Sequence, residues 1–267
     1  MKYHYVDIAE GQIHYRTMGQ GLPLILCHQA PMSGVEWEQI MPLLANDFTV
    51  YAPDMPGHGN SYEPGHALSM AEFGAQAIAF MDAVGIRQAY IAGNHSGAAL
   101  STYLAIHHPE RITRAAISCE MLATTDQINA FLSAIKSKPL SRDIPLDAAG
   151  KFISDAWLRY EMLAPSAPLE VRYKPFIHGQ LARLRQFDIH EAVLHWMSEQ
   201  DWVAQLPCPT LIFGAEYDLF FDTDKMAEAL TRIPNVQTVV IKNAGALSTF
   251  EQPEAVAQVL LTFFSDQ

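Results

Sequence analysis

Hydrophobic and polar positions alternate with a period of two near the start of the chain. Residues 2–8 (KYHYVDI) and 12–18 (QIHYRTM) show this alternation around a short turn, which predicts a β-hairpin. Two apolar runs follow, Leu22–His28 and Phe48–Asp54, and each is bounded by turn residues, as in the buried strands of a parallel sheet. The segment between them, residues 34–46, has the apolar spacing of a helix.

Strand and helix patterns then alternate as far as residue 120. Helical spacing over residues 69–85 starts with a capping box, in which Ser69 and Glu72 are three positions apart, and stops at a glycine. The next predicted elements are a strand (QAYIAG, 88–93), a helix from about Ser96 to His107, and a strand (RAAISCE, 114–120). This order is typical of an α/β fold with a mostly parallel sheet.

The pattern changes between Met121 and Glu199, where only helical spacing occurs and Pro139, Pro145, Pro165 and Pro168 break it into pieces. The predicted helical stretches are 126–137, 148–163, 178–187 and 189–200. Alternation resumes with a strand at 208–214, a helix at 224–233, a strand at 236–242 and an amphipathic helix at 253–264. We therefore expect a core formed by residues 1–120 and 200–267, with residues 121–199 inserted as a helical cap.

Composition and charge narrow the function classes. The 267 residues are 49% hydrophobic and carry a formal net charge of −12, which argues against nucleic acid or an anionic membrane as a partner. The first residues contain no apolar run of the kind found in a signal peptide or a membrane span. Cys27, Cys119 and Cys208 lie in or beside apolar runs and lack zinc-site spacing. A cytoplasmic protein with reduced thiols, acting on a small molecule as a monomer or homodimer, is expected.

Four stretches carry a resemblance to a known family. They are LPLILCHQAPMS (22–33), VYAPDMPGHGNS (50–61), YIAGNHSGAALSTYLAIHHPERI (90–112), and CPTLIFGAEYD with NAGALSTFEQPEAV (208–218 and 243–256). In order and spacing the chain resembles the α/β-hydrolase superfamily, in particular its small capped members. The resemblance implies a mostly parallel eight-stranded sheet flanked by helices, and a cofactor-independent active site under the cap. It also implies a nucleophile, an acid and a histidine, in that chain order.

The nucleophile position is the first departure from the family pattern. That pattern, Gly-x-nucleophile-x-Gly, fits the chain in one register, Gly93-Asn94-His95-Ser96-Gly97, which puts His95 at the tip of the turn. Placing Ser96 at the tip instead loses both flanking glycines and shifts the strand by one residue, which turns over every side chain. The proline of HPERI, fourteen residues after His95, lies about where the family places it. We therefore expect His95 at the tip.

The second departure lies near the C-terminus. The family places its general-base histidine in a loop before the last helix, and the corresponding position here is Ala246. Asp218 matches the family's acid position, and Glu120 lies where some relatives keep the acid instead. The resemblance leaves both carboxylates open as the partner that orients His95. His95 would act either as a general base or as a nucleophile that forms an acyl-imidazole.

Oxyanion and substrate contacts follow from the same resemblance. The family takes one backbone N–H from the residue after the nucleophile, here Ser96, and a second from the loop after the third strand, here Ala30. Gln29 stands where a glycine is usual and is expected to point its amide at the substrate as an alternative. His28 ends that strand, where a structural role competes with substrate binding.

Some histidines and acids invite a metal or a structural interpretation. A site built from His28, His95 and Glu120 is conceivable, but the spacings carry no metal signature and we expect none. Asp54 fits a turn residue at a strand end better than a catalytic acid. Trp157, Trp196 and Trp202 either line an apolar pocket or pack the cap on the core.

Two function classes remain after these observations. The first is a hydrolase that cleaves an ester, lactone, amide or C–C bond of a small apolar or aromatic carbonyl compound, with a lyase as a close variant. The second is a binding or sensor protein that kept the pocket and lost the chemistry. A bulky imidazole beside an acid and an oxyanion loop favours the enzyme.

Overall fold

The computed structural model describes most of the chain, and its central element is one mixed sheet. The described residues are 1–135, 145–165, 167–187, 189–199, 201–202, 205–221, 224, 226–227, 231–233 and 235–265. Within them the sheet has eight strands in the order β1-β2-β4-β3-β5-β6-β7-β8. The strands are β1 (Lys2–Ile8), β2 (Gly11–Gly19), β3 (Leu22–Cys27), β4 (Phe48–Pro53), β5 (Ala89–Asn94), β6 (Ile112–Ser118), β7 (Thr210–Ala215) and β8 (Val236–Ile241). Only β2 runs antiparallel to its neighbours β1 and β4, and the other pairs are parallel.

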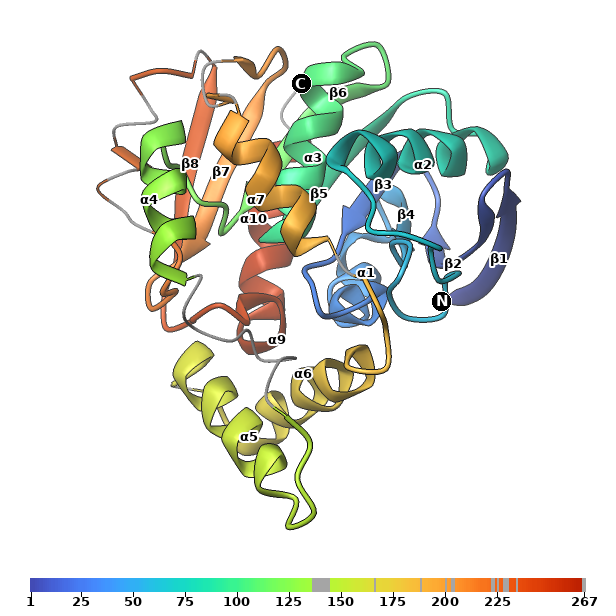
Figure 1. Cartoon of the computed structure of the whole chain (residues 1–267). Helices are drawn as coiled ribbons and strands as arrows, with labels where there is room; N and C mark the ends of the chain where they lie inside the picture. Colours follow the sequence, from blue (N-terminus) through green and yellow to red (C-terminus); the bar gives the residue numbers. More distant parts are fainter. Residues whose placement is uncertain are drawn as a thin grey trace.

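Helices cover both faces of this sheet (Figure 1). The helices on or near the core are η1 (Gly34–Trp37), α1 (Met41–Leu44), α2 (Met70–Ala83), α3 (Ser96–His107), α4 (Thr125–Ile135), α7 (His190–Glu199), α9 (Ser248–Glu251) and α10 (Pro253–Ser265). Helices α5 (Lys151–Leu163) and α6 (Leu169–Ala182) form a separate pair. None of the helices in the described ranges is long and apolar enough to cross a membrane.

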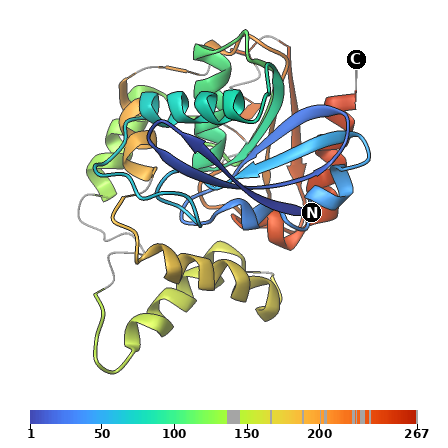
Figure 2. The ribbon, with the colours of Figure 1, turned by 90° about the vertical axis from the view of Figure 1, so that its right-hand side faces the viewer.

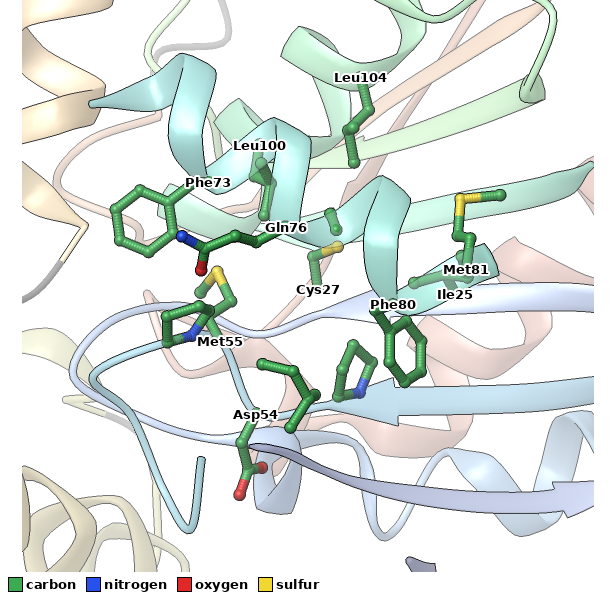
Figure 3. Close-up of a pocket in the computed structure, with 14 residues that line it drawn as sticks. Ile25, Cys27, Asp54, Met55, Phe73, Gln76, Phe80, Met81, Leu100 and Leu104 are labelled. Carbon is green, nitrogen blue, oxygen red and sulfur yellow. The ribbon is translucent and has the colours of Figure 1, made fainter. Parts of the chain in front are cut away.

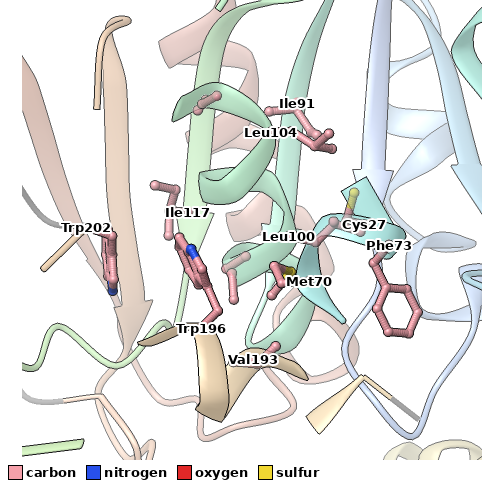
Figure 4. Close-up of a cluster of buried hydrophobic side chains, with 14 of the residues drawn as sticks. Cys27, Met70, Phe73, Ile91, Leu100, Leu104, Ile117, Val193, Trp196 and Trp202 are labelled. Atoms are coloured by element: carbon pink, nitrogen blue, oxygen red, sulfur yellow. The ribbon is translucent and has the colours of Figure 1, made fainter. Parts of the chain in front are cut away.

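Two hydrophobic clusters form because neighbouring strand residues point to opposite faces. Ile25, Ile91 and Ile117 pack with α2, α3 and α7 on one face, where Trp196 and Trp202 are also buried (Figure 4). Leu24, Leu26, Ala92 and Ala116 pack with α1 and α10 on the other face. The central strands are therefore apolar on both sides, which explains their continuous hydrophobic runs in the sequence.

The segment predicted as a cap divides between two locations. Helices α4 and α7 pack against each other, and α7 also contacts α2 and α3 of the core. The α5–α6 pair stands off from the sheet (Figures 1 and 2), and its Tyr160 and Phe176 lie in a small apolar cluster that also includes Met32, Leu247 and Phe250 of the core. Lys174 of α6 donates to Glu38 at 2.8 Å, and Arg185 donates to Glu63 at 3.1 Å, so ion pairs tie this pair of helices to the core.

Most predicted elements occur close to their predicted positions, with two exceptions. The capping box of Ser69 and Glu72 is confirmed, since Ser69 accepts from Glu72 N and the Glu72 carboxylate accepts from Ser69 N. Residues 34–46 contain a short 3-10 helix and a single α-turn rather than one helix. Helix α6 starts at Leu169, well before the predicted 178, because it accommodates Pro175 in its interior. The predicted helix 224–233 lies largely outside the described residues.

Candidate active site

The turn between β5 and α3 places His95 at the carboxyl edge of the sheet. His95 precedes the first residue of α3 and has φ 47° and ψ −114°, a backbone conformation that residues other than glycine rarely adopt. Its neighbours are close-packed: a Cβ on Gly93 would lie 2.1 Å from Gly97 O, and one on Gly97 would lie 2.2 Å from Cys27 O. Strain of about 1–3 kcal/mol at such a residue persists only where the surroundings enforce it. The two glycines are therefore what permits this sharp turn.

The imidazole of His95 meets the carboxylate of Asp218, which follows β7. His95 Nε2 lies 3.1 Å from Asp218 Oδ2, and their side chains are 16% and 0% exposed. The other carboxylate oxygen, Oδ1, accepts from Phe220 N at 2.8 Å, which fixes the carboxylate plane. Burial alone would raise the pKa of Asp218, but the nearby charge of His95 and the hydrogen bond from Phe220 N outweigh burial and lower it. Asp218 is therefore an ionised partner for the ring.

The surroundings of His95 also indicate which ring nitrogen carries the proton. Nε2 lies 3.3 Å from the carbonyl oxygen of Ala246 as well as beside Asp218, and both neighbours are acceptors. The proton therefore belongs on Nε2, and Nδ1 keeps its lone pair in the neutral ring. Burial alone would lower the pKa of His95, but Asp218, with smaller contributions from Glu36 and the Ala246 carbonyl, raises it above the ordinary value.

Cys119 completes a cluster at this point. Its thiol, a ring nitrogen of His95 and a carboxylate oxygen of Asp218 all lie within 4.8 Å of one another. These donor types occur in zinc sites. Burial and the charge of Asp218 raise the pKa of Cys119 well above its ordinary value, so the thiol is protonated in this arrangement. Among the described residues, the conceivable His28–His95–Glu120 set does not form a group of potential ligands.

Glu120, the other candidate acid, does not contact His95 in this structure. Its Oε2 accepts from Thr102 Oγ1 of α3 at 2.7 Å. Burial raises its pKa to about 8, so at neutral pH this carboxyl is mainly protonated. Between the two candidate acids, the structure brings Asp218 to His95 and leaves Glu120 with Thr102.

The expected oxyanion donors need one correction. Ser96 is the first residue of α3, so its N–H is one of the first-turn groups without a helical partner, as expected. The N–H of Ala30, however, donates to Ser96 Oγ at 2.7 Å. The serine hydroxyl thus occupies the position from which a substrate oxygen would accept this bond. A substrate can use Ala30 only by displacing that hydroxyl.

Gln29 and His28 do not face a substrate in this structure. The Gln29 amide donates to Glu36 Oε1 at 3.0 Å and its backbone N–H donates to Glu36 Oε2 at 2.7 Å. His28 is fully buried, with Nδ1 2.9 Å from Gln29 O and Nε2 accepting from Met55 N at 2.9 Å. Burial lowers the pKa of His28 to about 3, so it is neutral. Both residues hold the loop after β3 through these buried partners, and their substrate contacts stay a prediction.

Sequence patterns missed three residues that shape the site. The ring of Phe220 meets the His95 ring edge-on, with centroids 5.7 Å apart, while Phe220 itself is 43% exposed. Phe220 therefore covers one edge of the His95 ring and reaches the surface. Cys119 and Glu36 were missed because a thiol after a strand and a glutamate in helical spacing carry no local signal. Of these three residues, only Phe220 could have been predicted from the sequence, because it lies two residues after the acid of the family pattern.

The cap reaches the site through the loop before α9. Ala246 N donates to Leu163 O, the last residue of α5, at 2.8 Å. A Cβ on the preceding Gly245 would lie 2.3 Å from the same oxygen, so only glycine allows this approach. A separate cavity of about 30 Å³ lies between α2 and the sheet (Figure 3), lined mostly by apolar residues such as Met55, Phe73 and Phe80. It has room for little more than one water and does not include His95 or Asp218.

Comparisons with known proteins agree with this architecture. Residues 23–151 match the model of a family described as alpha/beta hydrolase fold. A soluble epoxide hydrolase of Corynebacterium sp. (strain C12) is 30% identical over 138 residues, which are 52% of this chain and 46% of that protein. The chain thus aligns with less than half the length of this relative. A pyrrolizixenacetamide deacetylase of Xenorhabdus hominickii is 25% identical, over 97% of this chain and 96% of the deacetylase.

A solved structure extends the comparison to the whole chain. The meta-cleavage product hydrolase CumD of Pseudomonas fluorescens IP01 superposes with a TM-score of 0.76. It is 21% identical and covers 98% of this chain and 97% of its own, a level of identity that shows the fold alone. With its eight-stranded sheet and these matches, the chain has the α/β-hydrolase fold.

Proposed function

We propose that this protein is a cofactor-independent hydrolase of a small, apolar or aromatic carbonyl compound, with His95 as its reactive group and Asp218 as the carboxylate that orients it. The observation that carries the proposal is the 3.1 Å approach of His95 Nε2 to Asp218 Oδ2. In the family pattern the tip residue is a nucleophile and a separate histidine serves it. Here the tip is itself a histidine, and the position of the second histidine is Ala246.

As a general base, His95 would act through Nδ1. The lone pair of Nδ1 takes a proton from water, and the water oxygen attacks the carbonyl carbon of the substrate. The resulting imidazolium is stabilised by Asp218, and it returns its proton to the leaving group as the tetrahedral intermediate collapses. The Ser96 N–H stabilises the negative charge on the substrate oxygen during this step.

As a nucleophile, His95 would attack the carbonyl carbon with the same nitrogen. An N–C bond then forms, the leaving group departs with its electron pair, and water hydrolyses the acyl-imidazole to the acid and free histidine. Both routes cleave the same bond and use the same Asp218 contact. They differ in whether acyl-enzyme accumulates during a burst of product release.

The surroundings of the reactive ring support an apolar substrate. Phe220 covers one edge of His95, and Met32, Leu247 and Phe250 are buried in the cluster that joins the cap to the core. Proteins similar to this chain include an epoxide hydrolase, a deacetylase and a meta-cleavage product hydrolase, which act on different bonds. The ester, lactone, amide and C–C bond therefore all remain candidate targets.

One observation favours a second candidate function. Because Ser96 Oγ accepts the Ala30 N–H at 2.7 Å, one of the two oxyanion donors is engaged in the unliganded protein. A lyase that only removes a proton from substrate carbon needs the His95–Asp218 pair more than it needs a complete oxyanion hole. A ligand sensor would need neither. Both alternatives predict binding of a small apolar carbonyl compound without hydrolysis.

A panel of short acyl and aryl esters, lactones and amides tests the proposal. Wild-type protein is assayed beside His95→Ala, with His195→Ala as the matched control because His195 is an exposed histidine on α7. We expect hydrolysis of at least one compound by wild type and His195→Ala, and none by His95→Ala. Binding of the same compounds without turnover by wild type would support the lyase or sensor alternative.

A further inference from the structure

A buried carboxylate lies directly beneath the candidate active site. Glu36, in η1, is 1% exposed and accepts four hydrogen bonds. Its Oε2 accepts from Gln29 N at 2.7 Å. Its Oε1 accepts from Gln29 Nε2 at 3.0 Å, Asn94 Nδ2 at 2.8 Å and Thr249 Oγ1 at 2.9 Å. Glutamate is rarely buried unless its oxygens have partners, so a buried glutamate with four hydrogen bonds indicates a specific role.

The three partners of Glu36 come from the three segments that surround His95. Gln29 immediately precedes Ala30, whose N–H reaches Ser96 Oγ. Asn94 immediately precedes His95 in the β5–α3 turn. Thr249, in α9, follows Ala246, whose carbonyl oxygen lies 3.3 Å from His95 Nε2. One carboxylate therefore connects the oxyanion loop, the reactive turn and the backbone behind the imidazole.

The partners of Glu36 favour its ionised form. The amide and backbone groups that face its oxygens are donors, so a proton on the carboxyl would meet other hydrogens. Burial raises the pKa of Glu36 above its ordinary value, and the four hydrogen bonds limit that rise. Asn94 donates to Glu36 through Nδ2, and its buried Oδ1 has no hydrogen-bond partner among the described residues. The side-chain amide of Asn94 is thus oriented by Glu36.

We propose that Glu36 is the positioning residue of this site, which holds the oxyanion loop, the β5–α3 turn and α9 together and places a second negative charge behind His95. The proposal rests on the function proposed above, since it assigns Glu36 a part in that reaction. Asp218 supplies the direct contact with the ring, and Glu36 acts through Asn94 and the backbone. The other titratable groups near the ring are the Cys119 thiol and, beyond Asp218, the carboxyl of Glu251.

The matched control is Glu38, two residues along the chain. Glu38 faces outward, where it accepts from Arg16 Nε at 3.1 Å and from Lys174 Nζ at 2.8 Å. Glu36→Gln and Glu38→Gln each remove one negative charge from the same segment. Only the first change removes an acceptor from the hydrogen-bond network under His95.

The test measures the titration of the His95 imidazole by NMR, without substrate, in wild type and both variants. His95→Ala identifies the resonance, and circular dichroism checks that each variant is folded. We expect Glu36→Gln to move the His95 midpoint to lower pH, because a nearby negative charge is lost, and Glu38→Gln to leave it in place. An unchanged midpoint in folded Glu36→Gln would overturn the electrostatic part of the proposal. The outcome does not depend on turnover, so failure of the proposed hydrolysis is detected separately.

A second variant tests the positioning part and covers the case in which Glu36→Gln does not fold. Thr249→Val removes one hydrogen bond to Glu36 and keeps its charge. We expect Thr249→Val to lower kcat on the best ester at least about threefold, because α9 loses its hydrogen bond to Glu36. KM and the titration midpoint of His95 should stay near their wild-type values. An unchanged kcat would overturn the positioning role.

Discussion

The Nε2 atom of His95 and the Oδ2 atom of Asp218 approach to 3.1 Å, although one residue follows β5 and the other follows β7. The contact needs the parallel arrangement of these strands, because it brings their carboxyl ends to one edge of the sheet. It also needs the long side chain of histidine at the tip of the turn. In the proposed function, His95 alone would therefore take the two roles that the family pattern gives to a nucleophile and a separate histidine.

Asp218→Asn should reduce turnover strongly without unfolding the protein. An amide keeps the size of the carboxylate but removes the charge that stabilises the imidazolium and that holds the proton on Nε2. We expect kcat to fall by a factor of about 10²–10⁴. Steady-state kinetics on the best ester, with the melting temperature measured in parallel, check this. A loss below about threefold would show that the carboxylate does not support the reactive ring.

The rate should rise with pH through the titration of His95. Both proposed routes use the neutral ring, and the pKa of His95 is raised above its ordinary value of about 6.5 by the charge of Asp218, which outweighs the effect of burial. The acid limb of kcat/KM against pH should therefore have a midpoint above about 6.5. In Asp218→Asn the midpoint should move to lower pH. A wild-type profile without an acid limb in this range would contradict a role for neutral His95.

Ser96→Ala should retain most of the activity. The substitution removes the hydroxyl that accepts the Ala30 N–H, and this N–H then becomes available to a substrate oxygen. The Ser96 backbone N–H is unaffected. We expect kcat between about half and several times that of wild type. A drop of about a hundredfold or more would show that the hydroxyl itself contacts the reacting atoms and that His95 is not the sole reactive side chain of the turn.

Glu120 should make stability depend on pH. Its pKa is raised to about 8 by burial, so the folded protein keeps this proton at pH values where the unfolded chain has released it. The contribution of Glu120 to stability is therefore complete below its unfolded pKa of about 4.5 and is lost progressively as pH rises through about 8. Urea unfolding at a series of pH values should show this loss in wild type and a flatter dependence in Glu120→Gln. Equal slopes for the two proteins would show that Glu120 titrates normally.

The fold could be predicted from sequence where local and global signals agree. Apolar runs gave the strands, and the pair Gly93 and Gly97 gave the register of the turn, because the backbone at these positions leaves no room for a Cβ. Helix α6 began earlier than expected because the interior Pro175 does not end it. A proline is a local signal, and the packing of α6 on α5 overrides it.

The site could be predicted only in part, for a physical reason. The position of Asp218 follows from the order of strands, whereas the choice between Asp218 and Glu120 depends on which way each side chain turns after its strand. Glu120 meets Thr102 of α3 instead. Gln29 meets Glu36, and no spacing rule indicates that a glutamate of η1 is buried. These contacts are tertiary, so they have no signature within a single segment.

The central claim is that the imidazole at residue 95 performs the chemistry, and chemical rescue tests it most directly. His95→Gly leaves room at the tip of the turn, and turnover of the best ester is measured with and without added imidazole, beside Asp218→Asn under the same conditions. We expect His95→Gly to be inactive alone and imidazole to restore its activity in a saturable manner, whereas imidazole should not restore Asp218→Asn. Full activity of His95→Gly without imidazole would show that the reactive group lies elsewhere in the site.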